Sequence, residues 1–177
     1  MDSSIIDEHT GLYNARHLGI LLDTEVYRSK RYVYQFSLVC VDLDGLKDLQ
    51  KSLSYDHYCR LLSELGQAFK SKLTLFAFAF YYGDGEFMVL LPQTAKEEGQ
   101  LIARWFHRFF KETSWLQGEG RSVQLPARVA VVAFPGDGKT IADLLKAMDR
   151  AMYLLKNSSA DGVVAAETGV LSPLETN

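Results

Sequence analysis

Residues 74–91 contain two short apolar runs separated by Gly83-Asp84-Gly85, and this pattern restricts the fold more than any other in the chain. In the first run Phe76, Phe78 and Phe80 alternate with small residues, as the two-residue repeat of a strand requires. The second run is equally rich in strand-forming residues. Glycine and aspartate tolerate the backbone angles of tight hairpin turns. The sequence therefore predicts a β-hairpin over 74–91.

The rest of the chain alternates between helical and strand-like patterns. Apolar residues at helical spacing predict amphipathic helices, and short β-rich runs predict strands. The predicted helices cover residues 14–29, 57–70, 95–112 and 141–156, and the further strands cover 35–41, 123–134 and 163–166. This order predicts an α/β fold with a mixed, mostly antiparallel central sheet flanked by helices.

No internal repeat or low-complexity linker divides the chain, so residues 1–177 are predicted to form a single domain. Its folded core is expected at about residues 7–166 and a flexible tail at 167–177. Helix 95–112 has the strongest helical pattern and carries Trp105, Phe106, Phe109 and Phe110. These aromatic residues and the face formed by the three hairpin phenylalanines either form one core layer or leave an exposed patch for docking.

Charge and hydropathy exclude several classes of function. A net charge of −3 and a pI near 5.8 provide no overall basic field for a nucleic-acid backbone. No leader peptide opens the sequence, and no apolar run approaches the ~20 residues that cross a bilayer. We therefore expect a cytoplasmic protein without membrane insertion and without a nucleic-acid partner.

Cys40 and Cys59 lack the C-x-x-C or Cys/His spacing of metal and redox motifs, so buried free thiols in a reducing compartment are expected. His9, His17, His57 and His107 are accompanied by no G-x-S-x-G or H-E-x-x-H motif. Hydrolytic chemistry is therefore a weak hypothesis, and solvated or helix-surface histidines are the simpler interpretation.

Two acidic residues follow the predicted strand 35–41, in the sequence Asp42-Leu43-Asp44-Gly45. Carboxylates at a strand end, facing the acidic turn of the hairpin, are a suitable cradle for Mg²⁺ because hard cations prefer oxygen ligands. Spacing alone makes this a weak signal, since Asp-Gly turns with nearby acids are common.

A second nucleotide motif competes with this one. Residues 133–140 fit a loose phosphate-loop pattern that ends in Gly138-Lys139-Thr140. As a phosphate loop it would bind phosphates through backbone amides and the Lys139 side chain. The usual first glycine is Ala133, and only ~37 residues follow, so a plain turn is the favoured interpretation.

Four ordered motifs resemble the GGDEF family, whose active members synthesise cyclic di-GMP. They are Asp7-Glu8-His9-Thr10-Gly11-Leu12-Tyr13-Asn14-Ala15-Arg16-His17-Leu18, then Phe36-Ser37-Leu38 with Asp42-Leu43-Asp44-Gly45-Leu46-Lys47, then Gly83-Asp84-Gly85-Glu86-Phe87-Met88-Val89-Leu90-Leu91-Pro92, and Ala147-Met148-Asp149-Arg150-Ala151-Met152-Tyr153-Leu154-Leu155-Lys156. They span nearly the whole chain at family-like spacing. The resemblance implies the nucleotidyl-cyclase-like fold, and a dimer in which two metal ions join two GTP molecules.

The resemblance implies that part of the family's site is retained. Asp42 and the Leu43 carbonyl match metal ligands, and Glu86 keeps its place in the signature. The backbone amides of Gly45, Leu46 and Lys47 and the Lys156 side chain match phosphate-binding positions.

Other family positions are substituted. The signature reads Gly83-Asp84-Gly85-Glu86-Phe87, so the metal-ligating acid of its third position is displaced by one residue, which should point the carboxylate elsewhere. Further substitutions fall on Gln50 and Cys59 (guanine recognition), Ala160 (phosphate), Thr74 and Ala77 (product inhibition), and Arg128-Val129-Ala130. The resemblance therefore implies family fold with most family chemistry removed, and no confident catalytic residue.

Three functions remain open at this point. The leading hypothesis is a catalytically impaired GGDEF domain that binds a protein partner in cyclic-di-GMP-related signalling, with no cofactor. It allows a homodimer and weak binding of a purine nucleotide, with Mg²⁺ only if nucleotide binding is retained. The alternatives are a residual or altered cyclase that uses Mg²⁺ and a purine triphosphate, and a phosphate-loop hydrolase built on Lys139.

Overall fold

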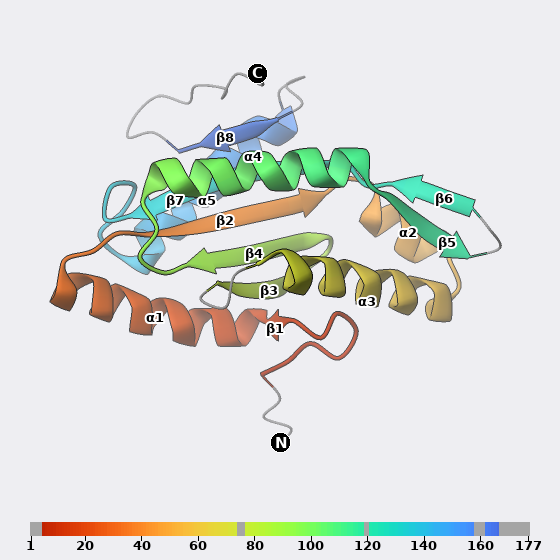
Figure 1. Cartoon of the computed structure of the whole chain (residues 1–177), viewed down its shortest axis with the longest axis horizontal. Helices are drawn as coiled ribbons and strands as arrows, with labels where there is room; N and C mark the ends of the chain where they lie inside the picture. The colour runs from red at the N-terminus through yellow and green to blue at the C-terminus, as the bar shows by residue number, and fades with distance from the viewer. Residues whose placement is uncertain (1–4, 74–76, 119–120, 158–161, 167–177) are drawn as a thin grey trace.

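The computed structural model describes residues 5–73, 77–118, 121–157 and 162–166, and within them it forms helices packed around a six-stranded sheet (Figure 1). The elements in chain order are β1 (Tyr13–Asn14), α1 (Ala15–Tyr32), β2 (Phe36–Leu43), α2 (Leu46–Ser52), α3 (Tyr55–Lys72), β3 (Phe78–Gly83), β4 (Glu86–Leu91), α4 (Lys96–Glu112), β5 (Ser114–Gly118), β6 (Arg121–Gln124), β7 (Ala127–Phe134), α5 (Ile141–Asn157) and β8 (Val163–Ala165).

The sheet has the strand order β1-β3-β4-β2-β7-β8. Strands β3, β4, β2 and β7 pair in antiparallel fashion, whereas the short edge strands β1 and β8 run parallel to β3 and β7. This arrangement confirms the predicted mixed, mostly antiparallel sheet. It also places β2, the strand that carries the acidic end, near the middle of the sheet.

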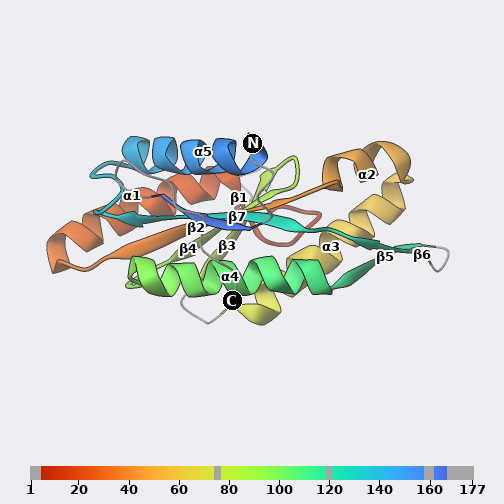
Figure 2. The same ribbon diagram turned by 90° about the horizontal axis from the view of Figure 1, so that it is seen from above.

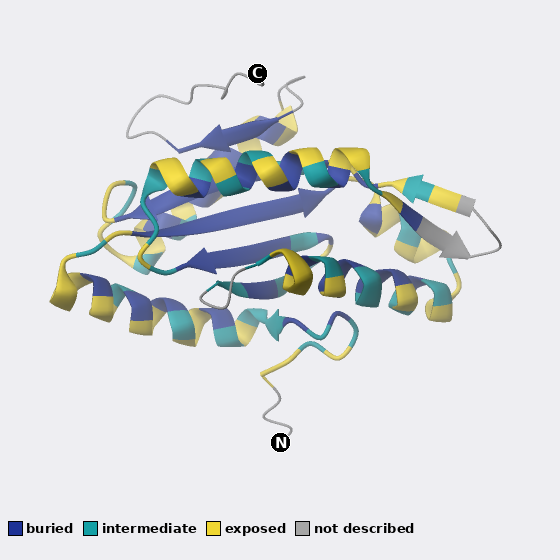
Figure 3. Ribbon diagram, in the orientation of Figure 1, coloured by how far each residue is buried: buried dark blue, intermediate teal, exposed yellow. Residues whose placement is uncertain are grey.

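Helices cover both faces of the sheet, as the view from above shows (Figure 2). Helices α3 and α4 cover one face of the sheet. Their apolar side chains, which include Phe69, Phe106 and Phe110, form the first core cluster together with strand residues such as Phe87 of β4. Helices α1 and α5 cover the other face and form the second cluster. Strand β2 is buried along its whole length (Figure 3), which explains its nearly continuous apolar sequence.

The helices begin where the sequence provides capping side chains. The Asn14 side chain accepts a hydrogen bond from the His17 amide at the start of α1 (3.0 Å), and Ser54 does the same for His57 at the start of α3. Such caps satisfy amide groups that have no partner within the helix. The observed helices agree with the predicted ones to within a few residues.

The aromatic residues of the hairpin and of α4 do not form one layer, so the first of the two alternatives for them was wrong. Phe80 belongs to the second cluster, below α1 and α5, whereas Phe106 and Phe110 belong to the first. Ala79, one residue from Phe80, faces the first cluster instead. The two-residue repeat of β3 is present, with the large residues on the face away from α4. The small residues are on the face toward α4, where they leave room for the α4 aromatics.

The predicted strand 123–134 is two strands, because Leu125 and Pro126 separate β6 from β7. Strand β6 pairs with β5 in a separate two-stranded hairpin, which the sequence did not predict. The predicted start of the hairpin at 74–76 and the expected tail at 167–177 lie outside the described residues. Within the part of the chain that is described, no helix is both long and apolar enough to cross a membrane.

Candidate active site

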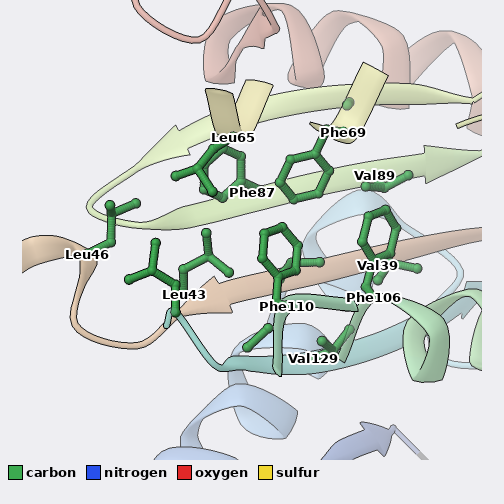
Figure 4. Close-up of a cluster of buried hydrophobic side chains, with 14 of the residues drawn as sticks. Val39, Leu43, Leu46, Leu65, Phe69, Phe87, Val89, Phe106, Phe110 and Val129 are labelled. Atoms are coloured by element: carbon green, nitrogen blue, oxygen red, sulfur yellow. The ribbon is translucent and has the colours of Figure 1, made fainter. Parts of the chain in front are cut away.

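The ends of two central strands bring the retained acidic residues together. Asp42 and Glu86 are direct partners in the antiparallel pairing of β2 and β4. Their neighbours Leu43 and Phe87 are buried in the first core cluster together with Leu46, which follows the acidic turn (Figure 4). Because these neighbours are packed on α3 and α4, the backbone that carries the two carboxylates has little freedom to move.

The signature segment forms a two-residue hairpin turn. Gly83 pairs with Glu86, and the two residues between them, Asp84 and Gly85, both have positive φ angles, of 50° and 90°. Two positive φ angles at the tip identify the tight turn that Asp-Gly favours and that matches the twist of the strands. The order Asp-Gly therefore fits the backbone of the turn, although it leaves position 85 without an acidic side chain.

The ammonium group of Lys156 lies between the two carboxylates. Lys156 Nζ is 3.2 Å from Asp42 Oδ2 and 3.0 Å from Glu86 Oε1. The lysine comes from the last turn of α5, on the face of the sheet opposite α3. One cation thus contacts both carboxylates at the point where a metal ion would need them.

Burial and charge oppose each other in this cluster. Burial raises the pKa of Asp42 above its ordinary value, although Lys156 acts in the opposite direction. Burial lowers the pKa of Lys156, but its hydrogen bond to Glu86 and the charge of Asp42 outweigh burial and raise that pKa overall. Lys156 therefore remains protonated beside Asp42, whose charged form is disfavoured by burial and favoured by the lysine.

The second acid of the strand end is paired elsewhere. Asp44 accepts two parallel hydrogen bonds from Arg128 of β7, at 2.9 Å and 2.7 Å. Arg128 also lies 4.0 Å from Asp42, its partner in the β2–β7 register. A bidentate pair of this kind fixes both side chains in one geometry. Sequence reasoning identified Arg128 only as a substituted position and missed this contact.

The acid displaced to position 84 is paired with a lysine of α2. Asp84 Oδ2 lies 3.0 Å from Lys47 Nζ, and both side chains are exposed. At the start of α2, Gly45 has a φ of 83° and Leu46 is fully buried. The predicted phosphate-binding segment, Gly45 to Lys47, is therefore a tight turn, and it lies next to the signature hairpin. Its lysine is engaged by Asp84.

The remaining predicted positions contribute little to this cluster. Gln50 is exposed on α2, and Cys59 lies on α3, where its sulfur contacts His9. Ala77 packs against the first core cluster, and Thr74 lies outside the described residues together with Ala160. Of the candidate site residues, the structure therefore gathers Asp42, Glu86 and Lys156.

The residues present do not fit a pair of divalent ions. Gly85 provides no side chain where the third carboxylate would be needed. In the described residues no group of three or more His, Cys, Asp or Glu side chains is arranged to hold a metal ion. Asp42, Glu86 and the Leu43 carbonyl are an incomplete set for Mg²⁺, which demands near-octahedral oxygen coordination.

The loop with the phosphate-loop pattern is closed by its own hydrogen bonds. The Ala133 amide donates to Asp137 Oδ2 (2.7 Å), and the Asp137 amide donates to the Ala133 carbonyl (2.8 Å). Lys96 of α4 pairs with the same aspartate at 2.7 Å. A buried carboxylate inside the loop opposes phosphate binding, so the geometry favours the plain turn.

Comparison with known proteins agrees with the motifs. The family model described as "Diguanylate cyclase, GGDEF domain" matches residues 4–161. Response regulator PleD of Caulobacter vibrioides is 27% identical over 165 residues, which are 93% of this chain and 36% of PleD. Diguanylate cyclase DosC of Escherichia coli is 22% identical over 158 residues, which are 89% of this chain and 34% of DosC. The chain thus spans about a third of the length of these relatives.

Solved structures show the same fold. The crystal structure of diguanylate cyclase SiaD from Pseudomonas aeruginosa, in complex with its activator SiaC, has a TM-score of 0.82 and 27% identity, covering 93% of this chain and 63% of SiaD. The isolated GGDEF domain of YfiN from the same organism has a TM-score of 0.82 at 21% identity, covering 92% of this chain and 94% of that domain. The family match, the sheet order and the hairpin signature together show that this chain belongs to the GGDEF diguanylate cyclase domain family.

Proposed function

We propose that this domain is a catalytically impaired GGDEF domain that acts as a regulatory or protein-interaction module in cyclic-di-GMP signalling. The observation that carries the proposal is the contact of Lys156 with both Asp42 and Glu86, beside a glycine at position 85. Metal-assisted phosphoryl transfer needs carboxylates to place the ions that activate the nucleophile and neutralise the phosphates. Here two carboxylates share one lysine, and the third is missing.

The second acid of the strand end supports the same conclusion. Asp44 is held by Arg128, and Asp84 is held by Lys47, so neither side chain replaces the missing ligand. The relative SiaD was crystallised with an activator protein, which is consistent with a GGDEF domain serving as a binding partner. A domain that folds with these internal ion pairs still presents a well-defined surface to another protein.

The test is a product assay with purified protein, GTP and either Mg²⁺ or Mn²⁺, followed by chromatography and mass spectrometry. A GGDEF domain with an intact signature serves as the positive control under the same conditions. We expect no cyclic di-GMP above the level of a Glu86→Gln control. Product formation that depends on Glu86 would overturn the proposal and support the residual cyclase.

A thermal-shift titration then separates an inactive binding site from a lost one. GTP, ATP and cyclic di-GMP are each tested with and without Mg²⁺, because a ligand of the native state stabilises it by RT ln(1 + [L]/Kd) and so raises the melting temperature. We expect no Mg²⁺-dependent shift with any of the three. A Mg²⁺-dependent shift without turnover would keep nucleotide binding as the domain's role and exclude a purely protein-binding module.

A further inference from the structure

The thiol of Cys59 on α3 meets the imidazole of His9, which comes from the loop before β1. Cys59 Sγ lies 3.6 Å from His9 Nδ1, within hydrogen-bonding range for sulfur, and His9 Nε2 lies 3.6 Å from Glu8 Oε1. A carboxylate near Nε2 favours the tautomer with its proton there, which leaves Nδ1 free to accept the thiol proton. The three residues thus have the order of a nucleophile, a base and a group that orients the base.

The imidazole is held in place by a tight loop. Asp7 Oδ1 accepts hydrogen bonds from the Thr10 amide (2.9 Å) and the Thr10 hydroxyl (2.7 Å), and the Gly11 amide donates to the Asp7 carbonyl. The loop rests on α3 at Gly66, where an added Cβ would lie only 1.9 Å from the Thr10 carbonyl oxygen. Gly66 is two helical turns from Cys59, so loop and thiol share one face of α3.

Tyr55 contacts the same thiol from one turn earlier on α3. A hydrogen bond with Cys59, and repulsion from the thiolate form of that residue, raise the pKa of the Tyr55 phenol above its ordinary value. The phenol therefore remains a hydrogen-bond donor near the sulfur at neutral pH. A donor and a base around one sulfur are the surroundings in which cysteines become nucleophilic.

The chain's other cysteine cannot form a disulfide with Cys59. Cys40 is buried in β2 and faces the second core cluster, whereas α3 covers the opposite face of the sheet. The chain contains two cysteines in all. A sulfur that bonds to Cys59 must therefore come from another molecule. Cys59 is partly exposed, so a small reagent can reach it.

We propose that Cys59 is a site of thiol–disulfide exchange with small-molecule disulfides such as glutathione disulfide, with His9 as the base. The Cys59 thiol gives its proton to His9 Nδ1, and the thiolate attacks one sulfur of the disulfide. The new Cys59–glutathione S–S bond forms as the old S–S bond breaks. The departing glutathione thiolate takes the proton from His9, so one disulfide and one thiol yield one mixed disulfide and one thiol.

The experiment measures modification of the native protein by glutathione disulfide at pH 7, with peptide mass spectrometry to follow both cysteines separately. We expect Cys59 to be modified while Cys40 stays free. The His9→Gln variant should slow Cys59 modification by about tenfold, because less thiolate is available for attack. His57→Gln is the matched control, since the His57 ring contacts Ser54 instead of the thiol, and its rate should stay within about twofold of wild type.

Modification of Cys40 reports misfolding, because that thiol becomes accessible only when the core opens. A His9→Gln protein that folds, leaves Cys40 unmodified and reacts at the wild-type rate would overturn the role of His9. A wild-type Cys59 as unreactive as Cys40 would overturn the site itself. Neither result depends on whether the domain binds a nucleotide, so this proposal stands or falls separately from the proposed function.

Discussion

The position that a Cβ would occupy at Gly85 lies 3.3 Å from the carbonyl oxygen of Leu43. The two residues are also joined by a hydrogen bond of 3.0 Å from the Leu43 amide to the Gly85 carbonyl. A carboxylate at position 85 would therefore stand beside the Leu43 carbonyl, close to Asp42 and Glu86. An acid added at this position would extend the oxygen set formed by Asp42, Glu86 and the Leu43 carbonyl.

The double variant Asp84→Gly/Gly85→Asp should gain divalent-cation affinity. Its stability should fall by about 1–2 kcal/mol, because the reversed order places a side chain at a φ of 90°, where the tight turn prefers glycine. Calorimetric titration with Mn²⁺ is the measurement, and we expect binding by the variant but not by the wild type. Adding Glu86→Gln to the variant should abolish it. Equal Mn²⁺ binding by wild type and variant would contradict this assignment of the missing ligand.

The local elements of this fold were predictable because each depends on residues close in sequence. Helical spacing predicted α1, α3, α4 and α5, and the signature hairpin followed from its turn residues. The two-residue repeat of β3 shows which side chains share a face, but it does not say which helices cover that face. For that reason the sequence allowed Phe80 to share a layer with the α4 aromatics, although it packs in the cluster of α1 and α5.

The contacts that define the site depend on register between distant strands. Arg128 meets Asp44 only because β2 and β7 pair so that Asp42 lies opposite Arg128, and no local pattern specifies this pairing. The position of Lys156 was known only from the resemblance to the family. Its contact with two carboxylates depends on how α5 is oriented over the sheet, which the sequence pattern does not specify.

Two lysines near the loop before α5 should differ sharply in their effect on stability. Lys96 pairs with the nearly buried carboxylate of Asp137 and also donates to the Ala166 carbonyl, whereas Lys139 is exposed. Lys96→Met should lower the free energy of unfolding by about 3 kcal/mol, since it leaves a buried charge without its cation. Lys139→Met should change it by less than about 0.5 kcal/mol. Urea unfolding measures both, and similar losses would show that Asp137 does not depend on Lys96.

Tyr34 should contribute stability that is lost at alkaline pH. Burial and the hydrogen bond to Glu25 raise the pKa of Tyr34 to about 12. Because the folded state holds this proton more tightly, the contribution is complete below pH ~10 and is lost as the pH rises toward 12. The stability difference between wild type and Tyr34→Phe should therefore shrink between pH 9.5 and 11.5 in urea unfolding (roughly the window between the two pKa values). Tyr32→Phe, at an exposed ring, is the control, and a constant difference for Tyr34 would refute the linkage.

Two helical glycines provide a matched pair for testing the packing of the loop at residues 7–12 on α3. An added methyl at Gly66 would collide with the Thr10 carbonyl oxygen at 1.9 Å, whereas nothing lies within 4 Å of one at Gly19. Gly66→Ala should lower the free energy of unfolding by about 2–3 kcal/mol, because the backbone of the loop must move. Gly19→Ala should raise it by up to about 1 kcal/mol through helix propensity.

Urea unfolding of both variants checks the two signs in one experiment. Because the displaced loop carries His9, Gly66→Ala should also slow the modification of Cys59, while Gly19→Ala should leave that rate unchanged. A stable Gly66→Ala protein would mean that the loop does not rest on α3. A destabilised protein with unchanged Cys59 reactivity would separate the packing of the loop from the position of His9.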